Sequence, residues 1–255
     1  MSTGDVLLLA PVPRPPHIRD HLTYEAHPNG AGLQVPEAFN EMPICYRCNV
    51  DAIVGPEDEP LWPAYSRPLD YELEIGFFVG RAGRNLSVDE AGTAIFGVTI
   101  FNDVSARDIQ RKEMTLKIVP SKGKDFCTAM GPCITTIDEI DEWSIELAAN
   151  VNCEIWSKGT TADRRYSVAE MLGWISYRED VQPGEFLAVG TVGESCGLEL
   201  ERWIKPGDLV ELSSPQIGVL RNQVGSPEIV PVGAGIPSYS GSERVGPTPP
   251  LRQEA

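Results

Sequence analysis

Two segments carry the clearest pattern of apolar and polar positions in the chain. In LDYELEIGFFV (69–79) the odd positions from 71 to 77 are apolar and two of the even positions are glutamates, which is the period-2 pattern of a β-strand. AIFGVTIFND (94–103) is an almost continuous apolar run that ends in an acid, which is typical of a buried strand. Both segments are therefore predicted to be strands.

Shorter patterns predict the remaining elements. Ser87 followed three residues later by Glu90 indicates a capping box, and so the start of a helix. Strands and helices do not alternate regularly, which argues against a doubly wound α/β fold. The pattern predicts a mainly β (α+β) protein with short helices. Its further strands are expected at 131–136, 145–156, 185–189, 209–212 and 218–224, and its helices at 87–94, 105–113 and 167–174.

The two flanks of the chain differ from this central part. Residues 11–60 are rich in Pro, Gly and Asn, which indicates a loop-rich arm or lid over the domain rather than a part of its core. Residues 226–255 are rich in Pro, Gly and Ser, which is typical of a tail. We therefore expect one domain over 1–225.

Composition excludes several classes of partner. The chain has 21 Lys and Arg against 37 Asp and Glu, a net charge of −16, which disfavours nucleic acid and anionic membranes. The apolar patch near the start is about five residues long, too short for a signal peptide or a membrane span, so we expect a cytoplasmic protein. Cys45 and Cys48 form a single CxxC without a second ligand pair, and we assign them no role.

Acidic residues on the two long strands suggest a metal site. Glu72 and Glu74 project from one face of a strand, with their Cβ atoms about 6–7 Å apart. Such a pair is also common on a solvated face. Asp103 follows a buried apolar run, where a carboxylate needs a compensating charge or a metal. Oxygen ligands of this kind select a hard cation, Mg²⁺, Mn²⁺ or Ca²⁺, over zinc.

Five sequence blocks now point to a family. They are LDYELEIGFFVG, GVTIFNDVSARDIQRKEM, KGKDFCTAMGP, GTVGESCGLEL and PGDLVELSSPQIGVLRN, in this order. Over about residues 17–225 the chain resembles the fumarylacetoacetate hydrolase family. The resemblance implies a mixed β-sandwich or β-roll of the fumarylacetoacetase C-terminal-domain type with short peripheral helices, and a homodimer.

The resemblance also implies a set of metal ligands. The E-x-E pair and the aspartate of the NDVSARD block correspond to family ligands, which are Glu72, Glu74 and Asp103 here. Fumarylacetoacetases proper have an Asp seven residues before a catalytic His, and RDHLTYEAH offers Asp20 as the fourth ligand and His27 as the base. The implied cofactor is one divalent cation, Mg²⁺, Mn²⁺ or Ca²⁺.

A second assignment of the base stays open. A shorter-chain branch of the family pairs a His and a Glu three residues apart on a lid, whereas His21 and Glu25 here are four apart. If His27 is the base, the ESCGLEL block implies that Glu199 orients it. The KGKDF block implies that Lys124 supplies positive charge to a developing oxyanion, although a shift of two residues would exchange it for Lys122.

The substrate contacts that the resemblance implies are only partly present. Gln110 and Thr191 match positions that contact substrate, and Arg107 matches one that either contacts substrate or supports a metal ligand. Met114 stands where fumarylacetoacetases proper have a tyrosine, and no arginine is found around Pro36 where they have one. An acylpyruvate or related diketo acid is therefore favoured over fumarylacetoacetate itself.

Three functions follow from these residues. The first is hydrolysis of a C–C bond in a small 2,4-dioxo or 1,3-diketo acid, for which the cation would polarise a carbonyl and a base would activate water. The second is decarboxylation of a 2-oxo acid such as oxaloacetate, or hydration or isomerisation, at the same metal site. The third is a non-catalytic scaffold that keeps the fold.

Overall fold

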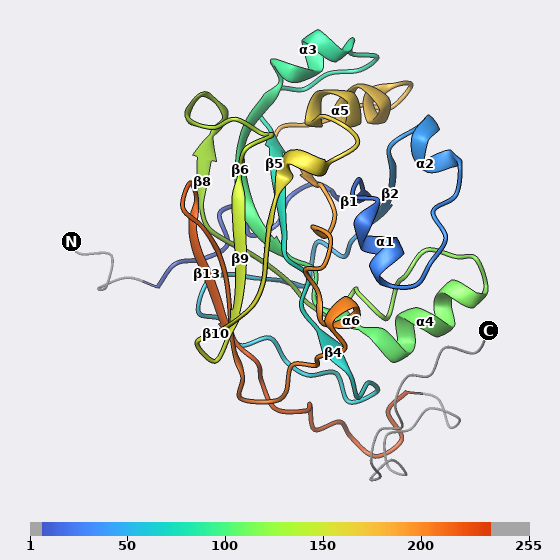
Figure 1. The fold of residues 1–255 in the computed structure, drawn as a ribbon, viewed down its shortest axis with the longest axis vertical. Coiled ribbons are helices and arrows are strands. Elements are labelled where there is room, and N and C mark those ends of the chain that lie inside the picture. The colour runs from blue at the N-terminus through green and yellow to red at the C-terminus, as the bar shows by residue number, and fades with distance from the viewer. Residues whose placement is uncertain (1–6, 236–255) are drawn as a thin grey trace.

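The computed structural model describes residues 7–235, and two packed β-sheets form most of its core (Figure 1). A two-stranded pair, β4 (Leu69–Asp70) with β7 (Ser105–Ala106), lies beside them. The larger sheet has the order β2 (Ile44–Arg47), β1 (Ile18–Leu22), β11 (Phe186–Ala188), β5 (Glu74–Val79), β6 (Ile95–Asn102), β8 (Thr128–Thr136) and β3 (Ile53–Val54). The smaller sheet has the order β10 (Glu154–Thr160), β9 (Glu146–Val151), β12 (Leu209–Ser214) and β13 (Gly218–Gln223).

The centre of the larger sheet is buried on both faces. On one face Ile75 and Phe77 of β5 join the main apolar core, which also contains residues of the smaller sheet such as Leu212. On the other face Phe78, Phe101 and Phe186 form a second apolar cluster, and the ring centroid of Phe186 lies 4.8 Å from that of Phe78 and 5.1 Å from that of Phe101. The prediction of a mainly β fold of the sandwich or roll type is confirmed.

Short helices surround the sheets. They are α1 (Ala26–Gly30), α2 (Ala38–Glu41), α3 (Val88–Gly92), α4 (Arg107–Thr115), α5 (Val168–Ser176) and α6 (Gly197–Leu200), with 3₁₀ turns at Ile137–Glu139 and Thr161–Asp163. Helices α3 and α5 lie together at one end of the molecule (Figure 1), and each begins with a capping box. The box predicted from Ser87 and Glu90 is present. Helices α1, α2 and α4 lie on the other side of the larger sheet from β9, β10 and β13 (Figure 1).

The expectation that residues 11–60 form an arm outside the core was wrong for β1. This strand lies inside the larger sheet, between β2 and β11, and Ile18 is fully buried. It pairs in parallel with residues 186–188, so its partner is remote in sequence and no hairpin turn marks it. Its sequence, IRDHL, also has too few apolar residues to read as a strand, because Asp20 and His21 line the cavity described below and Arg19 pairs with Glu179.

Two predicted strands are each divided in the structure. Residues 145–156 contain the whole of β9 and the start of β10, which form a hairpin with Asn152 and Cys153 at φ 53° and 65°. Two residues with positive φ are typical of a hairpin turn that usually contains glycine, and this turn has none. The segment 69–79 is divided between β4 and β5, and Glu72 bridges to Cys196 in the interval.

The flanks of the chain are only partly described. Of the predicted tail over 226–255, residues 236–255 lie outside the described residues, as do residues 1–6. The first part of the tail runs beside Trp62, whose carbonyl accepts a hydrogen bond of 2.8 Å from the Glu228 amide. Within residues 7–235, no helix has the length and apolar character needed to cross a membrane.

Candidate active site

The sheet register brings four acids together at one end of the larger sheet, on the face that carries the second apolar cluster. Glu74 lies opposite Phe101 in the antiparallel pair β5–β6, so Glu72 falls across from Asp103, just beyond the end of β6. Asp20 enters from β1, two residues after Ile18 of the second apolar cluster and on the same face. The second apolar cluster therefore lies next to the acids, on the same face of the sheet.

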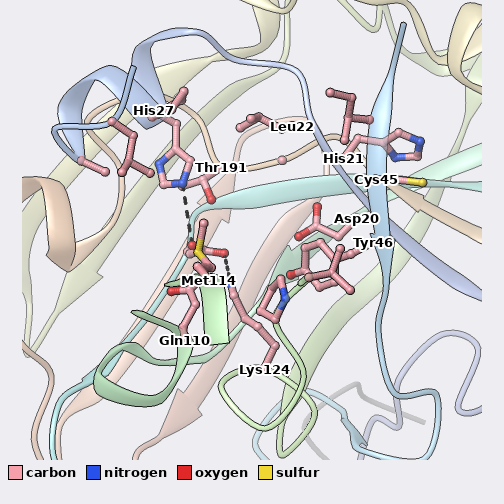
Figure 2. A pocket seen from close by; sticks show the side chains of 18 of the residues that line it. Asp20, His21, Leu22, His27, Cys45, Tyr46, Gln110, Met114, Lys124 and Thr191 are labelled. Carbon is pink, nitrogen blue, oxygen red and sulfur yellow. Dashed lines mark hydrogen bonds and ion pairs between the residues drawn. The ribbon is translucent and has the colours of Figure 1, made fainter. Parts of the chain in front are cut away.

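Three of these acids form a group that suits a cation. One carboxylate oxygen each from Asp20, Glu72 and Glu74 lies within 4.8 Å of the others, and all three side chains are buried. They line a cavity of about 600 Å³ that is also bordered by α1, α4 and the turn at Gly190 (Figure 2). Asp20 of β1, Glu74 of β5 and Glu72, which lies two residues before β5, are thus brought together in the structure.

Unpaired buried oxygens are what make this group fit a metal. Asp20 Oδ1, Glu74 Oε2 and Asp103 Oδ1 are buried and have no hydrogen-bond partner. Burial first, and then the neighbouring carboxylates, raise the pKa of Asp20 and that of Glu74 well above their usual values. A divalent cation would offset the repulsion between the carboxylates, because it supplies positive charge. It would also give the unpaired oxygens a partner, because it accepts lone pairs from hard oxygen ligands.

Glu72 differs from Glu74 because two buried cations hold it. Lys124 Nζ lies 2.5 Å from Glu72 Oε2, and an Arg107 guanidinium nitrogen lies 2.8 Å from Glu72 Oε1. Burial opposes ionisation of Glu72, but Lys124 and Arg107 outweigh it and lower the pKa. Lys122, which the sequence could not separate from Lys124, is exposed and lies over the Tyr65 ring.

Asp103 lies at the back of the site. Its Oδ2 is 2.8 Å from Lys124 Nζ and accepts a hydrogen bond from the Tyr46 hydroxyl. Within residues 7–235 it does not belong to the three-acid group, although its Oδ1 is unpaired. In this geometry Asp103 holds Lys124 and contributes negative charge beside Asp20.

His27 stands on α1 between two glutamates. Its Nδ1 lies 3.3 Å from Glu199 Oε2, and its Nε2 lies 4.0 Å from Glu72 Oε1. Backbone amides of Glu194 and Ser195 donate hydrogen bonds of 2.9 and 3.0 Å to the Glu199 carboxylate. Burial opposes ionisation of Glu199, but the nearby His27 imidazole and the hydrogen bonds from Cys196 and the backbone outweigh it and lower the pKa. Glu199 is therefore a fixed, ionised carboxylate beside the imidazole.

The other candidate base, His21, is held differently. It is buried in β1, its Nδ1 lies 2.9 Å from the Ala188 carbonyl oxygen, and burial lowers its pKa to about 4. In Figure 2 its ring lies on the opposite side of Asp20 from His27. Glu25, its proposed partner, is the residue before α1 and is exposed. The geometry favours His27 as the base.

The three predicted substrate contacts lie around the cavity, and each also supports another side chain. The Thr191 hydroxyl donates a hydrogen bond of 2.8 Å to Glu74 Oε1. Arg107 donates one of 2.8 Å to Gln110 Oε1, in addition to its pairing with Glu72. Gln110 and Met114 both project from α4 toward the cavity (Figure 2). Their roles as substrate contacts stay predictions.

Sequence reasoning missed two residues of the site. Asp70 is fully buried, accepts hydrogen bonds of 2.6 and 3.0 Å from the amides of Gly197 and Leu198, and lies 2.6 Å from Arg107. Its parity matches that of Glu72 and Glu74, so the alternation could have revealed it. Tyr46 comes from a short strand with no such signal.

A family model decides where the chain belongs. The model described as fumarylacetoacetate (FAA) hydrolase C-terminal matches residues 17–225. The chain belongs to this family. Its members with similar sequences or structures are named as several kinds of enzyme.

Three relatives illustrate the range. The oxaloacetate tautomerase YisK of Bacillus subtilis is 28% identical over 88% of this chain and 75% of its own. The 2,4-didehydro-3-deoxy-L-rhamnonate hydrolase of a Sphingomonas species is 31% identical over 80% of this chain and 70% of its own. The solved structure of 5-carboxymethyl-2-hydroxymuconate delta-isomerase from Mycobacterium smegmatis matches with a TM-score of 0.73 at 30% identity, over 88% of this chain and 84% of that one.

Proposed function

We propose that this member of the fumarylacetoacetate hydrolase family is a divalent-metal-dependent enzyme that hydrolyses a C–C bond in a small 2,4-dioxo or 1,3-diketo acid. The observation that carries the proposal is the group of Asp20, Glu72 and Glu74, which lines a cavity beside His27 and in which Asp20 and Glu74 each keep one unpaired buried oxygen. The preferred ions are Mg²⁺ and Mn²⁺, with Ca²⁺ as a third candidate, because every ligand is a carboxylate oxygen.

Each part of the site has a chemical task in this proposal. Asp20, Glu72 and Glu74 would hold the cation, which supplies Lewis-acid polarisation of the substrate carbonyl when bound. His27 takes a proton from water, and Glu199 keeps the imidazole oriented and stabilises its protonated form. Lys124 supplies positive charge near the position where an oxyanion develops, while it keeps Glu72 ionised.

A second function uses the same residues without water. One relative is named an oxaloacetate tautomerase and another a delta-isomerase. Such reactions need a base that moves a proton between carbon and oxygen, and His27 is positioned to do so within the same cavity. Tautomerisation, isomerisation or decarboxylation of a 2-oxo acid is therefore the alternative proposal.

The first experiment separates these functions. Chelator-stripped protein is assayed for consumption of acetylpyruvate and oxaloacetate, with Mg²⁺ or Mn²⁺ added back. We expect activity to return with metal in the parent and to stay absent in a Glu72→Ala/Glu74→Ala variant. The proposal fails if the stripped protein turns over either substrate as fast as the metal-loaded protein does, or if no metal restores any activity.

The His27 variant tests the proposed water-activating pair. Loss of a general base lowers the rate by about 10²–10⁴-fold. His27→Ala is expected to lose acetylpyruvate hydrolysis by such a factor while metal binding, measured by calorimetry, persists. His17→Ala is the control, because His17 lies outside the cavity wall. Undiminished hydrolysis in His27→Ala would eliminate the His27–Glu199 pair as the water-activating unit.

A further inference from the structure

The wall of the cavity is acidic at its buried end and apolar at its mouth. On the side of the mouth, Leu33 follows α1, and Ile118 and Val119 follow α4. These three side chains line the cavity and yet are 51%, 62% and 57% exposed. Apolar side chains half-exposed at a cavity mouth gain burial when an apolar ligand group covers them. The mouth is therefore suited to an apolar part of a ligand.

The buried cations of the cavity wall are already paired with acids, and so are not available to a second carboxylate at this mouth. Among the lysines and arginines that line the cavity in residues 7–235, Arg107 is held by Asp70 and Glu72. Lys124 is held by Glu72 and Asp103. The third, Lys117, is exposed at the rim, where an ion pair contributes little.

Charge around the site points the same way. The buried acids outnumber the buried bases Arg107 and Lys124 by three, and a divalent cation would offset two of those charges. One carboxylate of a ligand can be accepted at such a cation, whereas a second carboxylate farther out adds repulsion in a chain of net charge −16. The acids counted here are Asp20, Asp70, Glu72, Glu74 and Asp103.

We infer that the substrate is a monocarboxylic 2-oxo or 2,4-dioxo acid whose far end is apolar, seated between segments 31–36 and 116–120. This inference rests on the proposed function and specifies its substrate class. It distinguishes the chain from an enzyme that prefers oxaloacetate or another dicarboxylic acid. The 2-oxo carboxylate end lies at the acids, and the apolar end contacts Leu33, Ile118 and Val119.

A matched pair of ligands tests the inference by binding alone. Manganese-loaded protein is titrated in a calorimeter with 2-oxooctanoate and with 2-oxooctanedioate, which have the same length and differ in a terminal methyl or carboxylate. We expect the monoacid to bind at least about tenfold more tightly, since one or two buried methylenes give about this discrimination. Equal binding, or tighter binding of the diacid, would overturn the inference.

Two variants on one segment locate the apolar contact. Ile118→Asn removes the apolar contact without adding charge, and is expected to lose the roughly tenfold preference for the monoacid. Leu116→Asn is the matched control, because Leu116 is 71% exposed on the same segment and lies outside the cavity wall. The assignment of the mouth is wrong if both variants, or neither, lose the preference.

Measuring acetylpyruvate turnover distinguishes a failure of this inference from a failure of the proposed function on which it rests. Metal-restored consumption of acetylpyruvate tests the proposed function, whereas the calorimetric pair tests the far end of the substrate. Turnover with equal binding of the two ligands would overturn only the inference. Failure of both ligands to bind, together with no turnover, would overturn both.

Discussion

Two glutamates that look equivalent in the sequence have different surroundings in the fold. Glu72 is neutralised by Lys124 and Arg107, whereas Glu74 accepts one hydrogen bond from Thr191 and keeps its second oxygen unpaired. Removing the Glu72 charge would leave Lys124 paired with Asp103 alone and Arg107 paired with Asp70 alone. Removing the Glu74 charge would relieve repulsion among the acids.

The Glu74 variant tests that difference. Glu74→Gln is expected to raise the melting temperature of metal-free protein by about 2–4 °C, the shift that about 1 kcal/mol produces in a chain of this size. It is also expected to reduce the further rise that saturating Mn²⁺ gives in the parent, because a ligand is lost. Differential scanning calorimetry with and without Mn²⁺ measures both.

A buried glutamate elsewhere provides the control. Glu185 is fully buried and lies 3.6 Å from Arg19, away from the cavity wall. Glu185→Gln should lower the melting temperature and leave the rise with Mn²⁺ unchanged. If Glu74→Gln behaves like Glu185→Gln, Glu74 is a structural acid and the metal proposal loses a ligand.

The sequence indicated some of these residues better than others. Glu72 and Glu74 could be predicted because alternation places them on one face, and Asp103 because a buried strand ends there. Tyr46 could not, since its contact with Asp103 depends on β2 pairing with β1. Contacts that depend on strand order are not encoded in any local pattern.

At the scale of secondary-structure elements, Asp70 connects three of them. It ends β4, holds Arg107 at the start of α4, and accepts the first two amides of α6. Because Arg107 also holds Glu72, and α6 carries Glu199, Asp70 sets the spacing between a proposed metal ligand and the partner of the proposed base. We regard it as a positioning residue.

The Asp70→Asn variant tests this coupling. An asparagine leaves the Arg107 charge less compensated, which is expected to destabilise the protein by about 3 kcal/mol. Displacement of Glu72 is expected to weaken metal binding by about 10–100-fold, measured by calorimetry. Asp58→Asn is the control, because Asp58 Oδ2 accepts a bond of 2.7 Å from the Gly55 amide and Asp58 is not part of the cavity wall. Unchanged metal affinity in Asp70→Asn would contradict the positioning role.

The hairpin of β9 and β10 offers an element-scale prediction about stability. Cys153 has φ 65°, a conformation that glycine adopts without cost, so Cys153→Gly is expected to stabilise the protein by a few tenths to about 1 kcal/mol in urea unfolding. Cys133→Gly is the matched control, because Cys133 is an exposed cysteine inside β8 and its replacement should destabilise. Destabilisation by both variants would contradict the account of the turn.

The elements themselves were predictable where the chain is locally regular. The helices that begin at Ser87 and Ser167 and the long buried β6 follow from capping and apolar runs. Strand β1 was missed because two of its three polar residues, Asp20 and His21, line the cavity and its parallel partner β11 is remote in sequence. The part of the fold that sequence patterns hid is therefore the part that carries the proposed chemistry.

At the scale of the whole molecule, the net charge affects how two copies of the chain would associate. We propose that the chain forms a homodimer, as its family resemblance implies. Each protomer carries a formal charge of −16, so dimerisation must overcome repulsion between like charges. Salt weakens this repulsion, since the Debye length falls from about 30 Å at 0.01 M to about 10 Å at 0.1 M.

The predicted result is a dimer whose stability rises with ionic strength. Light scattering at micromolar protein should report the dimer mass in about 0.15 M salt and a lower average mass in about 0.01 M salt. Sucrose at matched osmolality is the control: because it carries no charge, it should not reproduce the effect of salt on the dimer. A monomer mass in both salt solutions would remove the homodimer from the proposal, and the site would then have to be complete within one chain.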